Sequence, residues 1–224
     1  MSLVLTLKAA GLNFARVSLY NEQVCTLFQV ETLKRSRKSE HLVAVATALF
    51  NRSGYHGVGI DQVIAEAGVA KTTLYRHFRS KEDLIVAVLR RNDERFRADM
   101  RDAVDRSASD PGERLLATFD FLEDWFRDPS FYGCPFMSAA GEYGERSSPV
   151  FQEVAMHKRL MVAYFEELAR VAGLEGPGSI AEGINLLHEG ATAVAHITGD
   201  PQTARKAKAV AAMLLAERRD GSPA

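Results

Sequence analysis

From residue 39 onward, apolar residues recur at the three- and four-residue spacing of amphipathic helices. The pattern stops at Gly54, which suits the residue just after a helix because glycine adopts the left-handed conformation without steric cost. The next helix is expected near Gly59 and another near Ala70. The first apolar series consists of Leu42, Val45, Ala46, Leu49 and Phe50.

Capping side chains and prolines mark the later helix starts. Ser80-Lys-Glu-Asp83 places a serine cap before two acids and opens a long helix, expected to reach about Val104. Asp110-Pro111, Ser148-Pro149 and Asp200-Pro201 are further starts, and Ser179-Ile-Ala-Glu182 is a capping box. They bracket helices near 111–127, 149–172, 179–198 and 201–218, with a shorter one over 135–143. No sheet is predicted, so the fold class is all-α.

Residues 1–33 do not fit this helical pattern. Val24-Cys-Thr-Leu-Phe-Gln-Val30 has a strand-like composition, but no later segment offers a partner strand. The segment is either a disordered or loosely attached extension, or the start codon is placed too early. We divide the chain into an N-terminal extension (1–35), a three-helix module (36–95) and a larger helical body (96–224).

The segment Gly57–Phe78 has the pattern of a helix-turn-helix. Two short helices flank Ala67-Gly68-Val69, and Gly68 stands where the first helix must stop and the chain reverse. In the second helix, Leu74 and Phe78 form a buried stripe. The remaining positions carry hydrogen-bonding or cationic side chains, as a helix that meets phosphates and base edges requires. An ordinary solvated helix face is the alternative.

The distribution of charge favours DNA binding. Residues 34–81 hold nine Lys or Arg against three Asp or Glu, although the whole chain has a net charge of −1. A basic module on an acidic body is typical of a protein that meets nucleic acid at one end. The two cysteines and the lack of a long apolar run indicate a cytoplasmic protein without disulfides, a signal peptide or a membrane span. No cofactor and no metal site are predicted, because no His, Cys, Asp or Glu cluster has ligand spacing.

Ile64-Ala-Glu-Ala-Gly-Val-Ala-Lys-Thr-Thr-Leu-Tyr-Arg-His-Phe-Arg-Ser-Lys81, followed by a helical body, resembles the TetR (tetracycline-repressor) family of transcriptional regulators. The match covers about residues 38–90. The resemblance implies a homodimer whose N-terminal modules enter the major groove of a palindromic operator, with a ligand pocket in the body. Two residues depart from the family pattern. Val58-Gly59 replaces hydroxyl residues, and Ala70 replaces a serine cap, which costs about 1 kcal/mol.

Seven residues are candidates for DNA contact. Lys71 and Thr72 open the second helix, where side chains reach base edges most easily. Arg76 suits either bases or phosphates. The remaining four are interpreted as phosphate contacts: Thr73, Tyr75, His77 and Lys81.

An effector pocket is expected near the aromatic-rich region 115–137. His157 lies in an apolar stripe and either lines this pocket or is a core histidine bonded to a neighbour. The lack of charged runs in 115–137 predicts a small, largely apolar effector, although the same aromatics can simply fill a core. The candidate wall residues are Trp125, Phe126, Phe136 and His157.

Cys134 and the alanine-rich C-terminal helices each allow two interpretations. Cys134 is either a sensor thiol near a helix N-terminus or a buried small hydrophobe. Alanine-rich helices over 179–198 and 201–218 allow a four-helix dimer interface, with packing inside one chain as the alternative. We expect a regulator that is not an enzyme, most simply a repressor released by its effector. The alternative is a helical thiol enzyme that uses Cys134, although no motif assigns it a general base.

Overall fold

The computed structural model describes residues 37–219, and within that range it contains helices and no strand. The first helix covers residues 37–53. It is followed by α3 (Ile60–Ala67), α4 (Lys71–His77), α5 (Lys81–Ser107), α6 (Pro111–Arg127), α7 (Pro135–Glu142), α8 (Pro149–Val171), α9 (Pro177–Thr198) and α10 (Thr203–Arg219). The all-α prediction is confirmed. The expected extension at residues 1–35 lies outside the described residues.

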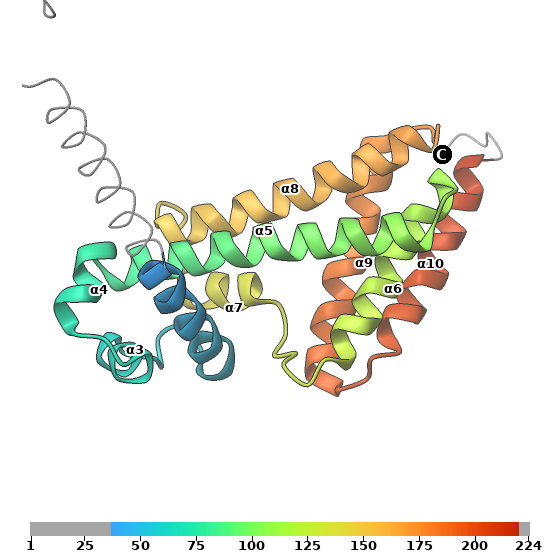
Figure 1. Cartoon of the computed structure of the whole chain (residues 1–224). Helices are drawn as coiled ribbons and strands as arrows, with labels where there is room; N and C mark the ends of the chain where they lie inside the picture. Colours follow the sequence, from blue (N-terminus) through green and yellow to red (C-terminus); the bar gives the residue numbers. More distant parts are fainter. Residues whose placement is uncertain (1–36, 220–224) are drawn as a thin grey trace, which may run out of the picture.

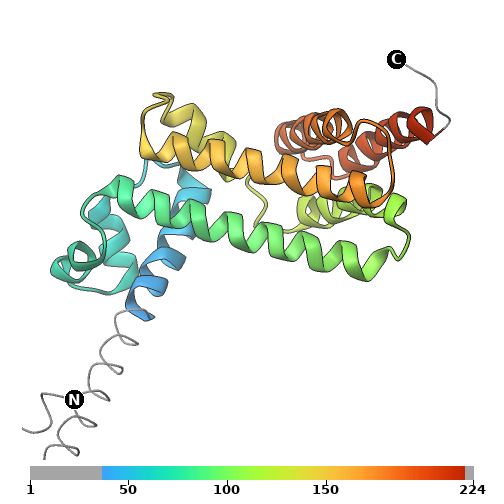
Figure 2. The ribbon, with the colours of Figure 1, turned by 90° about the horizontal axis from the view of Figure 1, so that it is seen from above.

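Helices α5 and α8 run side by side along the length of the molecule (Figures 1 and 2). The helix over 37–53 lies with α3 and α4 at one end, and α6, α9 and α10 lie at the other (Figure 1). Because α5 starts directly after α4 and continues into the second group, it joins the two ends mechanically.

Most of the predicted helix boundaries are confirmed by capping contacts. The backbone N–H of Gly54 donates to the carbonyl of Phe50 (2.9 Å), and Gly54 has a φ of 75°. The Ser80 side chain accepts from the backbone N–H of Asp83 (3.1 Å), and α5 continues three residues beyond Val104 to Ser107. The side chains of Asp110 and Ser148 cap α6 and α8 in the same way.

Two predicted starts are wrong. Helix α9 begins at Pro177, after Gly176 in the left-handed conformation (φ 66°), so the Ser179 capping box lies inside the first turn. The fixed φ of proline starts the helix two residues before the serine. Helix α10 begins at Thr203 instead of residue 201, because Asp200 caps a turn: its carboxylate accepts from Gln202 N–H (2.9 Å).

The buried apolar residues form two cores along α5. The module core joins the helix over 37–53, α3 and α4 to the first half of α5, and includes Leu42, Phe50, Val63, Leu74 and Leu89. The body core joins the second half of α5 to α6, α8, α9 and α10, and includes Met100, Leu115, Phe119, Phe165 and Ile184.

Helix α7 belongs to the module core, although α6 of the body precedes it in the chain. Phe136 and Ala139 of α7 are buried there, together with Val150 and Val154 of α8. Figure 2 shows α7 beside the first part of α8. A division of the chain at residue 95 therefore does not separate the two cores, because α7 and the start of α8 return to the N-terminal module.

Candidate DNA-binding surface and effector cavity

A sharp turn at Gly68 sets the angle between α3 and α4. Gly68 has a φ of 62°, and its N–H donates to the carbonyl of Ala65 (3.2 Å). The next N–H, that of Val69, donates to Ile64 (3.3 Å), which completes a Schellman-type ending. His41 Nε2 contacts the carbonyl oxygen of Ala67 at 3.0 Å, so the first helix also holds the end of α3.

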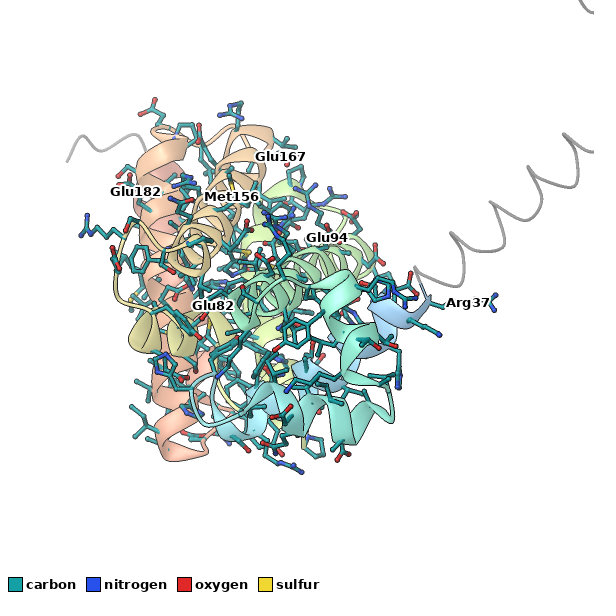
Figure 3. The ribbon with its side chains drawn as sticks, turned by 90° about the vertical axis from the view of Figure 1, so that its left-hand side faces the viewer. Arg37, Glu82, Glu94, Met156, Glu167 and Glu182 are labelled. Atoms are coloured by element: carbon teal, nitrogen blue, oxygen red, sulfur yellow. The ribbon has the colours of Figure 1, made fainter. Side chains whose placement is uncertain are left out.

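Helix α4 is anchored on one side and exposed on the other, as the sequence predicts. Leu74 is fully buried and Phe78 is buried beside it. Figure 3 looks at the molecule from the end that carries α3 and α4. Of the seven candidate DNA contacts, Thr73, His77 and Lys81 are partly exposed, and the exposed ones are Lys71, Thr72, Tyr75 and Arg76.

Val58, Gly59 and Ala70, which depart from the family pattern, leave α3 and α4 without a side-chain cap at their N-termini. Val58 is fully buried, so it packs in the module core and does not reach a phosphate. Neither Gly59 nor Ala70 makes a side-chain cap for the helix that follows it. The N-terminus of α4 therefore relies on its backbone contacts.

The two lysines at the edges of α4 make exposed contacts within the chain. Lys71 Nζ lies 2.9 Å from Asp61 Oδ1, and this hydrogen bond raises the pKa of Lys71. Lys81 Nζ donates to the carbonyl of His56 at 3.5 Å. Exposed pairs of this kind are worth little in water, so a DNA phosphate or base can replace them.

A cavity of about 630 Å³ lies between the two cores. Its lining comes from the helix over 37–53, from α5, α6, α8 and α9, from the segment between α6 and α7, and from the start of α7. Trp125, Phe136 and His157, three of the four expected wall residues, line it. Phe126 does not: it is buried behind the wall, with its ring 5.8 Å from Trp125 and 5.0 Å from Phe131.

His157 combines the two interpretations that the sequence leaves open, because it lines the cavity and has a bonded neighbour. Its Nδ1 lies 2.7 Å from Asp93 Oδ1, and its ring stacks on Phe136 with centroids 3.6 Å apart. A carboxylate only accepts, so Nδ1 carries the proton. Burial lowers the pKa of His157 despite Asp93, so at neutral pH the ring is uncharged. Burial acts to raise the pKa of Asp93, but bonds from His157 and Arg97 outweigh it and lower that pKa to about 2.

Comparisons with known proteins identify the family. The model described as "Bacterial regulatory proteins, tetR family" matches residues 42–88, and "Tetracyclin repressor-like, C-terminal domain" matches residues 111–211. A solved TetR-family regulator from Streptomyces coelicolor is 31% identical, with a TM-score of 0.75, over 82% of this chain and 96% of that one. The chain belongs to the TetR family of transcriptional regulators.

Relatives of this TetR-family chain are named as transcriptional regulators, and one of them as an activator. The transcriptional activator FasR of Mycolicibacterium smegmatis is 32% identical over 64% of this chain, and the match covers 64% of FasR, just under two thirds of its length. The regulator LmrA of Bacillus subtilis is 29% identical over 60% of this chain and 72% of LmrA. The reduced form of NemR from Escherichia coli, at 22% identity and a TM-score of 0.71 over 78% of this chain and 95% of that one, shares the fold. The chain is thus a DNA-binding transcriptional regulator.

Several cavity residues of the TetR-family chain escape sequence analysis. Lys158 Nζ lies 2.6 Å from both carboxylate oxygens of Glu189, inside the lining. Asn51, Asn92 and Asn185 also line the cavity. These residues come from four different helices, and only in the folded chain do they meet. The aromatic region 115–137, on which the expectation of a largely apolar effector rests, supplies only part of the wall.

Cys134 forms part of the cavity lining and caps α7 with its backbone. Burial raises the pKa of its thiol, although Lys158 Nζ lies 3.7 Å from its Sγ. A raised pKa disfavours the thiolate on which nucleophilic catalysis depends. The neighbouring His157 is bonded to Asp93 instead. This geometry therefore gives no support to the thiol-enzyme alternative. The relatives are also named as regulators.

Residues 37–219 contain neither a metal-binding cluster nor a membrane-spanning helix. Within them, no group of three or more His, Cys, Asp or Glu side chains is arranged to hold a metal ion. None of the helices in that range is long and apolar enough to cross a lipid bilayer.

Proposed function

We propose that this chain is a ligand-responsive regulator, acting as a repressor, which binds a palindromic operator as a homodimer and releases it when a small molecule occupies the cavity. One observation carries the proposal: the first helix of the DNA-binding module forms part of the cavity lining. Ala44, Thr47, Ala48 and Asn51 of that helix face the same cavity as residues of α5, α6, α8 and α9.

The same cavity is linked to α3 through α7. Glu142, at the end of α7, accepts hydrogen bonds from the backbone N–H groups of Tyr55 (2.8 Å) and His56. At the start of α7, the carbonyl of Pro135 accepts from the Tyr55 hydroxyl (3.1 Å). Pro135 and Phe136 also line the cavity. A ligand that displaces the start of α7 therefore pulls on the loop that leads into α3.

The proposed contacts with DNA follow the exposed side of α4. Lys71 and Thr72, at its first turn, reach base edges in the major groove, and Arg76 contacts a base or a phosphate. Thr73, Tyr75, His77 and Lys81 hold the phosphates that set the register. Four ligand contacts are proposed from the sequence. Of these, Trp125, Phe136 and His157 line the cavity, and Phe126 supports Trp125 from behind.

The dimer interface is proposed on α9 and α10. Ala191, Ala195, Ala204 and Ala211 are buried within one chain, so these alanines pack α9 against α10. A second set of apolar side chains on the same helices is exposed, and exposed apolar patches of this kind mark interfaces. The set consists of Leu186 (71%), Val194 (46%), Ile197 (81%), Val210 (50%) and Met213 (69%).

The coupling free energy that ligand-induced release from the operator requires is modest. A 100-fold loss of operator affinity on ligand binding corresponds to a coupling free energy of about 2.7 kcal/mol, which lies in the usual allosteric range. It requires the ligand to bind better to the conformation that does not fit the operator.

Footprinting on a library of DNA sequences, followed by titration of single variants, tests the DNA contacts. Lys71→Ala should reduce the preference for operator over random DNA by about tenfold or more, because a base contact is worth about 1–3 kcal/mol. Lys81→Ala should weaken binding to all sequences and flatten the salt dependence by about one unit per site. Lys206→Ala on α10 is the control and should change neither, since Lys206 Nζ pairs with Asp200 (2.8 Å) just before that helix.

Two results count against the proposal. Equal losses of specific and random binding in Lys71→Ala would remove its base-reading role. A chain that protects no DNA segment from cleavage, at a protein concentration where it is dimeric, would refute operator binding itself.

A further inference from the structure

Three asparagines of the cavity lining have a buried amide atom without a hydrogen-bond partner. These atoms are Asn51 Oδ1, Asn92 Nδ2 and Asn185 Oδ1, and they make up the set of such side-chain atoms within the described residues. Buried polar atoms are nearly always paired, and each unpaired one costs free energy. Because all three side chains line the same cavity, a small rotation of each amide brings its unpaired atom to the occupant, which then supplies the missing partner.

The unpaired atoms specify which groups the occupant offers. Two of them are carbonyl oxygens, on the helix over 37–53 and on α9, and they accept hydrogen bonds. The third is an amide nitrogen on α5, which donates. An occupant with N–H groups satisfies Asn51 and Asn185, and one acceptor atom satisfies Asn92.

The charges of the lining disfavour an anion. Lys158 is neutralised by Glu189 at 2.6 Å, and Arg95 lies 3.6 Å from Asp99. His157 and His188 have pKa values lowered by burial, so they are uncharged at neutral pH. The described lining holds two cationic side chains, Arg95 and Lys158, against four carboxylates, so it disfavours an anionic ligand; the carboxylates are Asp99, Asp124, Asp128 and Glu189.

Two more carboxylates face the cavity and attract positive charge. Asp124 lies 3.8 Å from Arg127, which is also bonded to Glu123. Asp128 accepts from the hydroxyl and the backbone N–H of Ser130, which lowers its pKa and keeps it ionised.

Aromatic rings form the apolar part of the lining. Phe96 and Trp125 meet edge to face, with centroids 5.0 Å apart, and Phe121 lies 5.3 Å from Phe96. Such surfaces hold flat aromatic rings, and their faces also attract cations. A volume of about 630 Å³ suits a ligand of drug-like size.

We infer that the cavity binds a flat aromatic ligand, uncharged or positively charged, whose N–H groups donate to Asn51 and Asn185. This inference rests on the proposed function only in treating the cavity as the effector site. Since Asn51 belongs to the DNA-binding module and Asn185 to the body, the ligand bridges the two parts of the chain directly.

Three probes of equal size test the charge preference by isothermal titration calorimetry on the full chain. They are naphthalene rings that carry an amidinium, a carboxamide or a carboxylate group. The amidinium and the carboxamide should bind, and the carboxylate should bind at least about tenfold more weakly. Carboxylate binding as tight as that of the other two overturns the inference. Failure of both the amidinium and the carboxamide to bind at about millimolar concentration also overturns it.

Single variants test the assigned hydrogen bonds. Asn51→Ala and Asn185→Ala should each weaken the amidinium and carboxamide probes by about five- to tenfold, the usual effect of one lost hydrogen bond. Because these oxygens have no partner in the chain, both variants should melt at or above the temperature of the parent. Ser53→Ala, an exposed position near the end of the same helix, is the control and should leave probe affinity unchanged. Unaltered affinity in both asparagine variants would refute the assignment.

DNA release is measured separately, by fluorescence anisotropy of a labelled operator at saturating carboxamide. Calorimetric binding without release would contradict the proposed function and leave the ligand class standing. Release by the carboxylate alone would overturn the ligand class and leave ligand-responsive regulation standing.

Discussion

At the scale of single residues, the body core keeps a histidine uncharged. His188 lies between Phe119 and Phe165, with ring centroids 4.3 and 4.7 Å away, and its Nε2 is 2.8 Å from Thr118 Oγ1. The Thr118 hydroxyl donates to the carbonyl of Leu115 (2.6 Å), so its oxygen accepts from the histidine N–H. Burial lowers the pKa of His188 to about 3.

This histidine predicts a loss of stability in mild acid. Below a pH of about 6.5, the unfolded chain binds a proton at His188 that the folded chain excludes, so the free energy of unfolding falls. The slope is at most about 1.4 kcal/mol per pH unit, or about 2 kcal/mol between pH 6.5 and pH 5. Urea unfolding at about pH 7.5 and about pH 5 should show this decrease, and His157 adds to it with the same sign.

His188→Gln isolates the contribution of His188. Glutamine retains an N–H donor for Thr118 and does not titrate in this range. The variant should lose part of the pH dependence that the parent chain shows. An equally steep pH dependence in His188→Gln would show that other groups cause it.

At the scale of elements, α4 is a short helix whose N-terminus has no side-chain cap. It has seven residues, and its N-cap is Ala70, which has extended backbone angles and no side-chain cap. The neighbouring helix α5 shows the contrast, since Ser80 caps it through Asp83 N–H. Short helices depend on such caps, because their unpaired N–H groups are a large share of their backbone.

Ala70→Ser should therefore stabilise the chain. A serine at an N-cap is worth about 1 kcal/mol over alanine, and Ala70 is exposed, so the hydroxyl fits without repacking. The urea midpoint of unfolding should rise. Ala65→Ser, at an exposed position inside α3, is the control and should lower it slightly. A midpoint that falls in both variants would show that α4 does not start at Ala70 in solution.

Helix α7 offers a second prediction at this scale, for the coupling between cavity and DNA. Glu142→Ala leaves the N–H groups of Tyr55 and His56 without their acceptor, which should cost about 1–3 kcal/mol of stability. Ligand should still bind, but it should release less operator, because α7 no longer holds the loop before α3. Calorimetry and operator anisotropy measure the two effects on one sample.

Glu145→Ala is the matched control for this experiment. Glu145 lies three residues beyond the end of α7. Among the contacts described, its carboxylate bonds only to the nearby Ser147. When ligand binds, the Glu145→Ala variant should release operator as the parent chain does. Full release from Glu142→Ala as well would mean that the coupling does not run through α7.

At the scale of the whole molecule, the exposed apolar side chains of α9 and α10 predict dimerisation. Ile197→Lys combined with Met213→Lys places two charges where the proposed interface is desolvated, so it should yield monomers with at least about tenfold weaker operator binding. The two positions are 81% and 69% exposed in one chain, so the monomer should remain folded.

Sedimentation equilibrium gives the mass, and circular dichroism reports the fold. Met156→Lys, 46% exposed on α8 and labelled in Figure 3, is the control and should stay dimeric. A double variant that remains dimeric would place the interface on another surface.

The sequence by itself determined the elements and the family. Apolar spacing placed Leu74 and Phe78 in the module core, and local caps such as Ser80 marked helix starts, because both signals depend on residues close together in the chain. The Ser179 capping box predicted the start of α9 two residues too late, because Pro177 starts the helix. The motif ending at Lys81 was specific enough to indicate the TetR family.

Only the tertiary structure decided the cavity and its link to DNA. Trp125, Phe136 and His157 were found through their apolar surroundings, but Phe126 shares that pattern and lies behind the wall. Asn51, Asn92 and Asn185 carry no local signal. A lone asparagine on a helix is ordinary until helices distant in the chain enclose its amide and leave it without water or a partner. Burial and pairing across helices are properties of the packed chain, so the effector chemistry is decided at that level.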